Sequence, residues 1–544
     1  MFNVLGGVLL FAAVCGTGLF LAIAAQRHAG KNGQRRSSAA SYLQYIQDKQ
    51  ALNALGYAQQ LRRSWSGFGT FSASFTSMSI LAGAAIYFGP VFSLTGAWGF
   101  SVALPLAALF AFVVAAANAE LASATPTAGG CYHWARARGG RSWSWGTAWL
   151  RGLSDMGLLI LFAGFAAQIL HGSLAGYLGF AEGRISFLLC AALLLFTQAL
   201  VAWQGRLWIR GFMKLGLWLQ VGIVTAIAGG LFLVIGPRLQ PAEYLFTFDP
   251  GGTGQVGFAH MLVSLLFMFK LFAGSDAAAY TMEEARQPQL HVPWSIYLAP
   301  VYGFVFGYVL MTLLVLTTSS TGGPLHDNFF IAMLSGRWGV WNDWAGTVIS
   351  AGVFAALWGS GLSVLNASSR LWFAFSRDRR SAAGRWFAWI PRQRQTPERL
   401  ILLLTVTALA ILAALVAVHP WHDANGTIWL WPLTGLTLVS TGIAFAIPLG
   451  LHLFGGRRRR EHVQVWHPGR LSLPLRWTAF VWMLLVALAS ALYISAAAAL
   501  IAVLVLLCAV LAAQLPRLRR RHPLPKQPAT REELLRIEQQ YRHI

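Results

Sequence analysis

Thirteen stretches of this chain are long and apolar enough to cross a lipid bilayer as α-helices. A helix rises about 1.5 Å per residue, so about 20 apolar residues span the hydrocarbon core. We place the spans near residues 3–25, 70–90, 97–119, 145–170, 184–203, 212–236, 258–281, 294–318, 345–372, 400–418, 427–454, 476–495 and 497–516. The sequence therefore predicts an all-α polytopic membrane protein.

The composition excludes an ordinary soluble protein and gives no sign of enzyme chemistry. Of the 544 residues, 56% are hydrophobic and 11% are charged, against about 25% charged residues in soluble domains. The chain has no phosphate-binding loop, zinc-protease histidine pair or nucleophile elbow. His419, His422 and Asp423 cluster in an expected external loop, but their spacing favours a solvated loop over a metal site. We expect no enzyme activity, no cofactor and no metal.

The net charge of +23, from 41 Lys and Arg against 18 Asp and Glu, is unevenly distributed. The basic residues gather in alternate loops, within 27–63, 136–141, 377–399, 457–460 and 517–521, whereas the opposite loops hold only Arg184, Arg238 and Arg337. Basic loops stay on the cytoplasmic side of a membrane. We therefore expect a multi-pass protein of the plasma membrane (the inner membrane in a bacterium) with a cytoplasmic C-terminus, and we expect lipid rather than nucleic acid to meet this charge.

Two stretches between spans carry the most specific patterns. Residues 120–134 read ELASATPTAGGCYHW, in which Thr125-Pro126 ends a helix and Gly129-Gly130 allows a tight turn. Residues 364–378 read VLNASSRLWFAFSRD and join a span to a basic loop. Both stretches closely resemble signature segments of the amino acid–polyamine–organocation (APC) permeases, in the branch that carries amino acids, GABA and choline. The resemblance covers roughly residues 48–515.

The resemblance implies a LeuT-like inverted-repeat fold with twelve core helices, in which helices 1–5 and 6–10 form the two repeats. This chain adds one extra N-terminal helix. We expect residues 1–47 to form that helix and a basic linker, 48–516 the permease core and 517–544 a basic cytoplasmic tail. Ala22-Ile23-Ala24 is similar to a signal-peptidase site, but the apolar stretch is long and lacks a basic start, so we favour a retained helix.

The resemblance also implies two broken helices that bind the substrate between them. An unwound helix frees backbone N–H groups, and its new N-terminus attracts a carboxylate. The matching residues are Ser77, Ser79, Ile80, Leu81, Ala82 and Gly83 in core helix 1, and Phe272, Ala273, Gly274, Ser275 and Asp276 in core helix 6. Small residues that serve only helix packing remain an alternative for the first set, and capping of freed N–H groups is an alternative role for Asp276.

A second group of residues points to coupling and gating. Lys270 lies roughly 18 Å into its helix and Asp155 about as deep in its own. We hypothesise that the two pair and that Lys270 replaces a coupling cation, as a lysine on core helix 5 does in some relatives; Gln220 lies near that position here. A watery vestibule is the alternative environment for both charges. Glu283 and Glu284 belong either to an inner gate or to surface ion pairs with nearby arginines. The resemblance assigns Glu120 and Arg370 to the gating segments.

These observations predict a secondary active transporter that moves an amino acid or a related organic amine by alternating access, either proton-coupled or exchanging. Choline, a polyamine or GABA is the alternative substrate. A sensor or structural membrane protein that keeps the permease fold without flux is an alternative of another class. The expected partners are a small-molecule substrate and the lipid bilayer.

Overall fold

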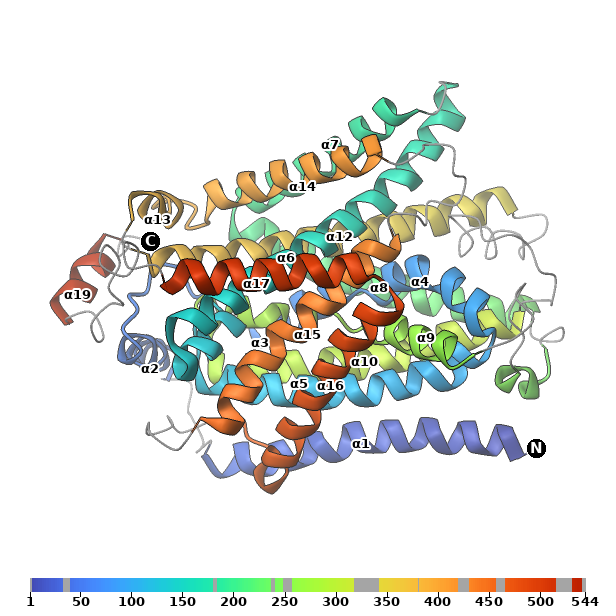
Figure 1. The fold of residues 1–544 in the computed structure, drawn as a ribbon, viewed down its shortest axis with the longest axis horizontal. Helices are drawn as coiled ribbons and strands as arrows, with labels where there is room; N and C mark the ends of the chain where they lie inside the picture. Colours follow the sequence, from blue (N-terminus) through green and yellow to red (C-terminus); the bar gives the residue numbers. More distant parts are fainter. Residues whose placement is uncertain are drawn as a thin grey trace.

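The computed structural model of this chain describes residues 2–32, 40–179, 183–235, 240–247, 257–317, 342–379, 381–418, 430–455, 465–514 and 531–540. Within these ranges, 13 helices are long and apolar enough to cross a membrane, and there is no β-strand. The helices lie side by side in one bundle (Figure 1). The predicted all-α membrane fold is therefore confirmed. His419, His422 and Asp423 lie outside the described residues.

The elements run in the order expected for an extra helix followed by a permease core. Those of the first half are α1 (Phe2–Asn32), α2 (Ala40–Ala54), α3 (Gly67–Met78), α4 (Ile80–Thr95), the π-helix η1 (Gly99–Ala103), α5 (Leu104–Ala124), α6 (Cys131–Leu178), α7 (Arg184–Trp203) and α8 (Arg206–Ile235). Those of the second half are η3 (Ala242–Phe246), α9 (Phe258–Lys270), η4 (Ser275–Thr281), α10 (Pro288–Thr317), α12 (Asn342–Arg377), α13 (Ala382–Phe387), α14 (Glu398–Val418), α15 (Leu430–Phe454), η6 (Gly469–Leu471), α16 (Ser472–Tyr493), α17 (Ala496–Gln514) and α19 (Arg531–Gln539).

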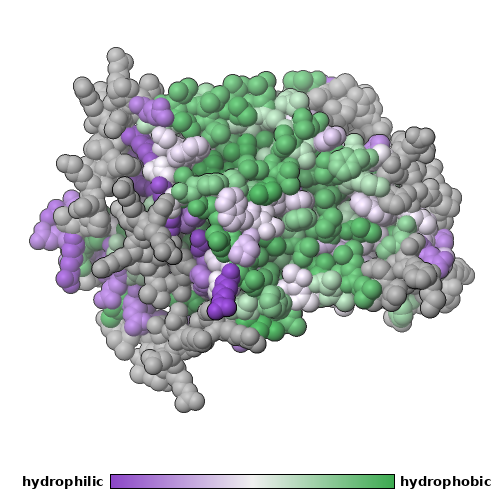
Figure 2. Space-filling view, turned by 60° about the horizontal axis from the view of Figure 1, so that its bottom comes forward, coloured by the Kyte–Doolittle hydropathy of each residue, from purple (hydrophilic) through white to green (hydrophobic). Residues whose placement is uncertain are grey.

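Large apolar side chains cover the outside of the bundle. Leu193 on α7, Leu403 on α14, Leu488 on α16 and Leu504 on α17 are all exposed. Figure 2 shows hydrophobic residues across the middle of one face, with hydrophilic residues gathered toward the end where α19 lies. An apolar surface of this extent is stable only against lipid. We call the end that holds α2, α13 and α19 the basic end, because Arg377, Arg385, Arg392, Arg394 and Arg399 lie there.

The extra helix α1 packs along α5 and also touches α10 (Figure 1). Its buried side chains include Val14 and Leu21. The hydroxyl of Tyr297 on α10 donates a hydrogen bond of 2.6 Å to the backbone carbonyl of Gly18. A Cβ atom at Gly18 would lie 3.3 Å from the ring of Phe112, so the glycine lets α1 approach α5 closely. Helix α1 therefore makes specific packing and hydrogen-bond contacts with α5 and α10.

A protein that begins at Ser41 should still insert and transport, because the permease pattern starts after that residue. Its thermal stability should fall, because the Tyr297 hydroxyl and the groove beneath α1 lose their partners. Uptake into vesicles and a detergent-solubilised melting curve measure the two effects separately. Loss of uptake at a normal membrane level would instead give α1 a part in the transport cycle.

Candidate functional site

Two spans are broken at mid-length. The first core span ends as α3 at Met78 and resumes as α4 at Ile80, with Ser79 between them in a left-handed conformation (φ 39°). The Ser79 hydroxyl accepts the N–H of Ala82 at 3.2 Å and so caps α4. The sixth core span ends as α9 at Lys270 and resumes as η4 after Gly274 (φ 91°). Both predicted breaks are present, and the free N–H groups of the first turn of α4 point toward the break.

The carbonyl groups near the end of α3 find donors on a neighbouring helix. Ser360 on α12 donates to the carbonyl of Thr76 at 2.9 Å, and Ser363 donates to that of Ala73 at 3.1 Å. The Ser74 hydroxyl in turn accepts the N–H of Ala278 in η4 at 3.1 Å. These bonds hold α3 against α12 and η4 against α3. They satisfy polar groups that have no water to bind at this depth.

The two breaks touch each other at Gly274. A Cβ atom on this residue would lie 2.8 Å from the hydroxyl oxygen of Ser77 and 3.0 Å from its carbonyl oxygen. Gly83, one turn into α4, is also packed: a Cβ there would lie 2.4 Å from a methyl group of Leu271 in the α9–η4 turn. Leucine at either position would therefore separate the two broken spans as well as fill space between them.

Alanine at Gly274 should destabilise the protein and abolish transport, because the residue combines a left-handed backbone with a steric clash against Ser77. The backbone strain alone costs about 1–3 kcal/mol. Alanine at Gly211 is the matched control, since nothing lies within 4 Å of its added Cβ. Melting temperature and uptake should both stay near wild type in the control. Wild-type uptake by Gly274→Ala would show that contact between the breaks is not needed.

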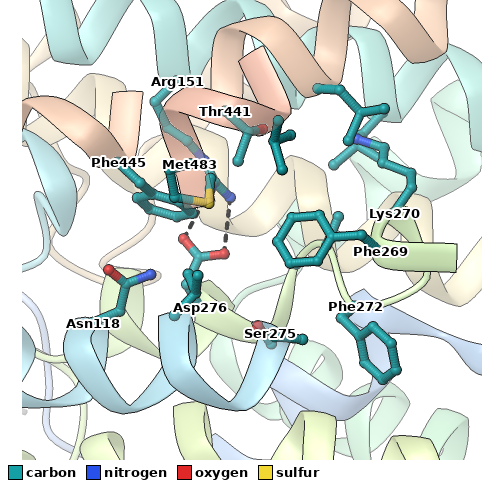
Figure 3. Close-up of a pocket in the computed structure, with 17 residues that line it drawn as sticks. Asn118, Arg151, Phe269, Lys270, Phe272, Ser275, Asp276, Thr441, Phe445 and Met483 are labelled. Atoms are coloured by element: carbon teal, nitrogen blue, oxygen red, sulfur yellow. Dashed lines mark hydrogen bonds and ion pairs between the residues drawn. The ribbon is translucent and has the colours of Figure 1, made fainter. Parts of the chain in front are cut away.

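A cavity of about 40 Å³ lies beside the second break, between α5, α6, α9, η4, α15 and α16 (Figure 3). Its polar lining residues are Asn118, Arg151, Lys270, Ser275, Asp276 and Thr441, and aromatic side chains such as Phe269 and Phe445 complete the walls. Phe272, Ala273 and Gly274 line it too, as the sequence analysis predicts for a binding site. The predicted residues of the first break, Ser77, Ser79, Ile80, Leu81, Ala82 and Gly83, are buried around the break and are not among the cavity's lining residues.

Arg151 is the centre of a buried ion network at the cavity. Its Nε donates to Asp155 at 2.8 Å. Its Nη1 lies 2.9 Å from Oδ2 of Asp276 (Figure 3). All three side chains are almost completely buried. Asp276 therefore forms an ion pair with α6. A guanidinium that serves two carboxylates in this way holds the η4 half-helix against α6.

The structure corrects the predicted Asp155–Lys270 ion pair. Asp155 pairs with Arg151, one helical turn before it, and the Nζ atom of Lys270 finds no hydrogen-bond acceptor among the residues that the structure describes. The sequence analysis did not single out Arg151. The sequence did contain evidence for the Arg151–Asp155 pair, because an arginine four residues before an aspartate inside an apolar span places both charges on one helix face.

Gln220 on α8 is buried, and within the described ranges neither polar atom of its side-chain amide has a partner. It is not a lining residue of the cavity at Lys270. The described residues hold no group of three or more His, Cys, Asp or Glu side chains arranged to bind a metal ion.

Two buried ion pairs join the segment after η4 to α12 at the basic end. Arg377 binds Glu283 through two hydrogen bonds of 2.7 and 2.9 Å, and Arg370 binds Glu284 at 2.9 Å. Burial by itself raises the pKa of the Glu283 carboxyl, but Arg377 and the N–H of Ala128 outweigh burial and hold that pKa below its usual value. The prediction of arginine partners is confirmed, whereas a surface position for these two glutamates is wrong.

The signature segments meet at the same end. Glu120, at the end of α5, is bound by Arg476 at 2.7 Å and by the hydroxyl of Ser472 at 2.7 Å, both on α16. Asp378, just after α12, accepts the hydroxyl of Tyr132 at 2.7 Å and pairs with Arg136. Charged side chains from residues far apart in sequence therefore join the helices at this end of the bundle.

Comparisons with known proteins find relatives among the amino acid permeases. A family model for amino acid permeases matches residues 68–513. An amino-acid permease of Arabidopsis thaliana, BAT1, is 25% identical over 79% of this chain and 86% of its own length. The amino-acid permease 2 of Neurospora crassa is 23% identical over 83% of each chain. The branched-chain amino acid permease BcaP of Lactococcus lactis is 26% identical over 50% of this chain and 60% of its own.

Proposed function

This chain belongs to the amino acid permease family, and we propose that it is a secondary transporter that moves an amino acid across the membrane by alternating access. It is a multi-pass membrane transporter and not an enzyme. The observation that carries the proposal is the contact between two mid-span helix breaks, at Ser79 and Gly274. Paired breaks of this kind are where transporters bind their substrates.

The substrate carboxylate binds in this proposal at the first turn of α4 and at the Gly274–Ser275 turn. The first N–H groups of a helix have no partner in the helix itself, and the positive end of its dipole attracts an anion. Ser79 already serves one of these groups, that of Ala82. The close packing of Gly83 on Leu271 means that a substrate must separate the two broken spans slightly when it enters.

The ion pairs at the basic end act in this proposal as the inner gate. Glu283–Arg377 and Glu284–Arg370 tie the chain after η4 to α12, and Glu120–Arg476 ties α5 to α16. Opening of the bundle at the basic end requires the Glu283–Arg377 and Glu284–Arg370 pairs to separate, because both connect the second broken span to α12. The basic loops assign this end to the cytoplasm, and with it the C-terminal helix α19.

Coupling is the finer part of the proposal. Arg151, Asp155, Asp276 and Lys270 form a buried charged group beside the second break, and such groups inside a membrane mark proton or substrate pathways. We assign coupling to this group, with protons as the driving ion or exchange of one amino acid for another. The side chain of Gln220 is neutral, so it does not supply a coupling charge in this scheme.

Uptake by purified protein in proteoliposomes tests the function. Radiolabelled amino acids, GABA, choline and polyamines are offered one at a time, with an imposed pH gradient or with unlabelled amino acid inside the vesicles. Accumulation driven by the gradient supports proton coupling, and accumulation that needs internal amino acid supports exchange. Uptake of choline or polyamines alone would favour the alternative substrates, and binding without accumulation would favour a sensor.

A further inference from the structure

The cavity at Lys270 has charges of opposite sign on opposite sides. Lys270, only 4% exposed, lies on one side, and Asp276 and Asn118 lie on the other (Figure 3). Among the described residues, the Lys270 Nζ atom has no acceptor and the Asn118 Oδ1 atom has no donor. Polar groups this deeply buried are normally satisfied. The cavity therefore offers a buried donor at one end and a buried acceptor at the other.

The charges of the site restrict that occupant. The positive charges of Arg151 and Lys270 balance the negative charges of the two carboxylates that Arg151 binds, so the net charge of the four side chains is zero. An added anion or cation would leave an uncompensated charge inside the bilayer, which is costly. A zwitterion adds no net charge. It also supplies a carboxylate for the ammonium of Lys270 and an ammonium for the carboxylate of Asp276.

We propose that this cavity binds a small zwitterionic amino acid, with its carboxylate on Lys270 and its ammonium group on Asp276 and Asn118. The inference rests on the proposed transport of amino acids and places a second binding position next to the helix breaks. The volume of about 40 Å³ holds about three water molecules, so the side chain of the occupant is small. Ser275 and Gly274 belong to both positions, so a single substrate occupies one or the other.

Alanine uptake into proteoliposomes, with glycine, β-alanine, propionate and propylamine as competitors, tests this assignment. Lys270→Met should raise the KM for alanine roughly 10- to 100-fold, the cost of losing a hydrogen bond to a charged group. Propylamine, which lacks a carboxylate, should then compete with alanine better than it does in the wild type. Lys270→Arg should restore much of the affinity, and Lys214→Met, at an exposed position on α8, is the matched control.

A second variant covers the case in which Lys270→Met fails to fold. Val114→Phe fills the cavity from α5 without changing any charge, and it should block alanine uptake while the protein still purifies as a stable monodisperse species. Unchanged KM in Lys270→Met, or normal uptake by Val114→Phe, would show that the cavity holds water only. Either result leaves the proposed function standing, because that proposal fails only if the wild type transports no amino acid.

Discussion

Replacing Arg151 by methionine should be the most damaging single change in this protein. The substitution leaves Asp155 and Asp276 buried next to each other without the guanidinium that binds both. Removing one partner of a buried ion pair costs about 3–5 kcal/mol. We expect a large drop in melting temperature, loss of amino acid uptake and little mature protein in the membrane.

A charge-balanced variant separates stability from function in this case. The triple change Arg151→Met, Asp155→Asn and Asp276→Asn removes the stranded charges and should recover much of the melting temperature but none of the uptake. Arg394→Met is the matched control, because the Arg394 side chain is 47% exposed in its pair with Glu398. If Arg151→Met alone melts like the wild type, the network does not hold η4 to α6.

Breaking the Glu283–Arg377 pair should open the basic end of the bundle. Cys131, which is buried beside the hydroxyl of Tyr280, reports on this opening through its reaction with a membrane-impermeant maleimide. In a protein without Cys15, Cys190 and Cys508, we expect Glu283→Gln to raise the labelling rate about tenfold, the effect of roughly 1.4 kcal/mol on the closed state. The reason is that a charged pair with two hydrogen bonds becomes a weaker neutral contact.

The pH dependence of this labelling follows from the lowered pKa of Glu283. A carboxyl with a lowered pKa stabilises the closed form at all pH values above its unfolded pKa, and this contribution is lost only as the pH falls through the lower folded value. The maleimide reacts with the thiolate, so the labelling rate of any cysteine rises with pH, and the informative quantity is the ratio of the rates in Glu283→Gln and in the Glu283-containing protein at each pH. This ratio should stay constant from about pH 5 to pH 8. A wild-type labelling rate in Glu283→Gln would rule out the pair as a gate.

The number of spans could be predicted from the sequence alone, because apolar length sets it. The broken helices were predicted from the resemblance to the APC permeases, because the small residues around Ser79 left helix packing as an alternative. The structure breaks at Ser79 and Gly274. The acidic pair at Glu283 and Glu284 was also assigned arginine partners, since a basic segment follows α12.

The partners of the buried charges were harder to predict, because they depend on how the helices rotate. Depth in the membrane places Asp155 and Lys270 at a similar level, but only the packed structure shows that Asp155 turns toward Arg151 on its own helix. The burial of Glu283 and Glu284 also depends on how the helices pack. From the sequence alone, a position next to a basic loop is expected to lie at the surface. The docking of Tyr297 on the carbonyl of Gly18 has no sequence pattern at all.

Uptake of radiolabelled amino acids by the purified protein in proteoliposomes tests the central claim most directly. The account predicts that wild-type protein accumulates at least one small neutral amino acid above its external concentration, driven by a pH gradient or by internal amino acid. Gly274→Ala should abolish that accumulation and Gly211→Ala should retain it. Stable, folded wild-type protein that accumulates no amino acid under either condition would contradict the account.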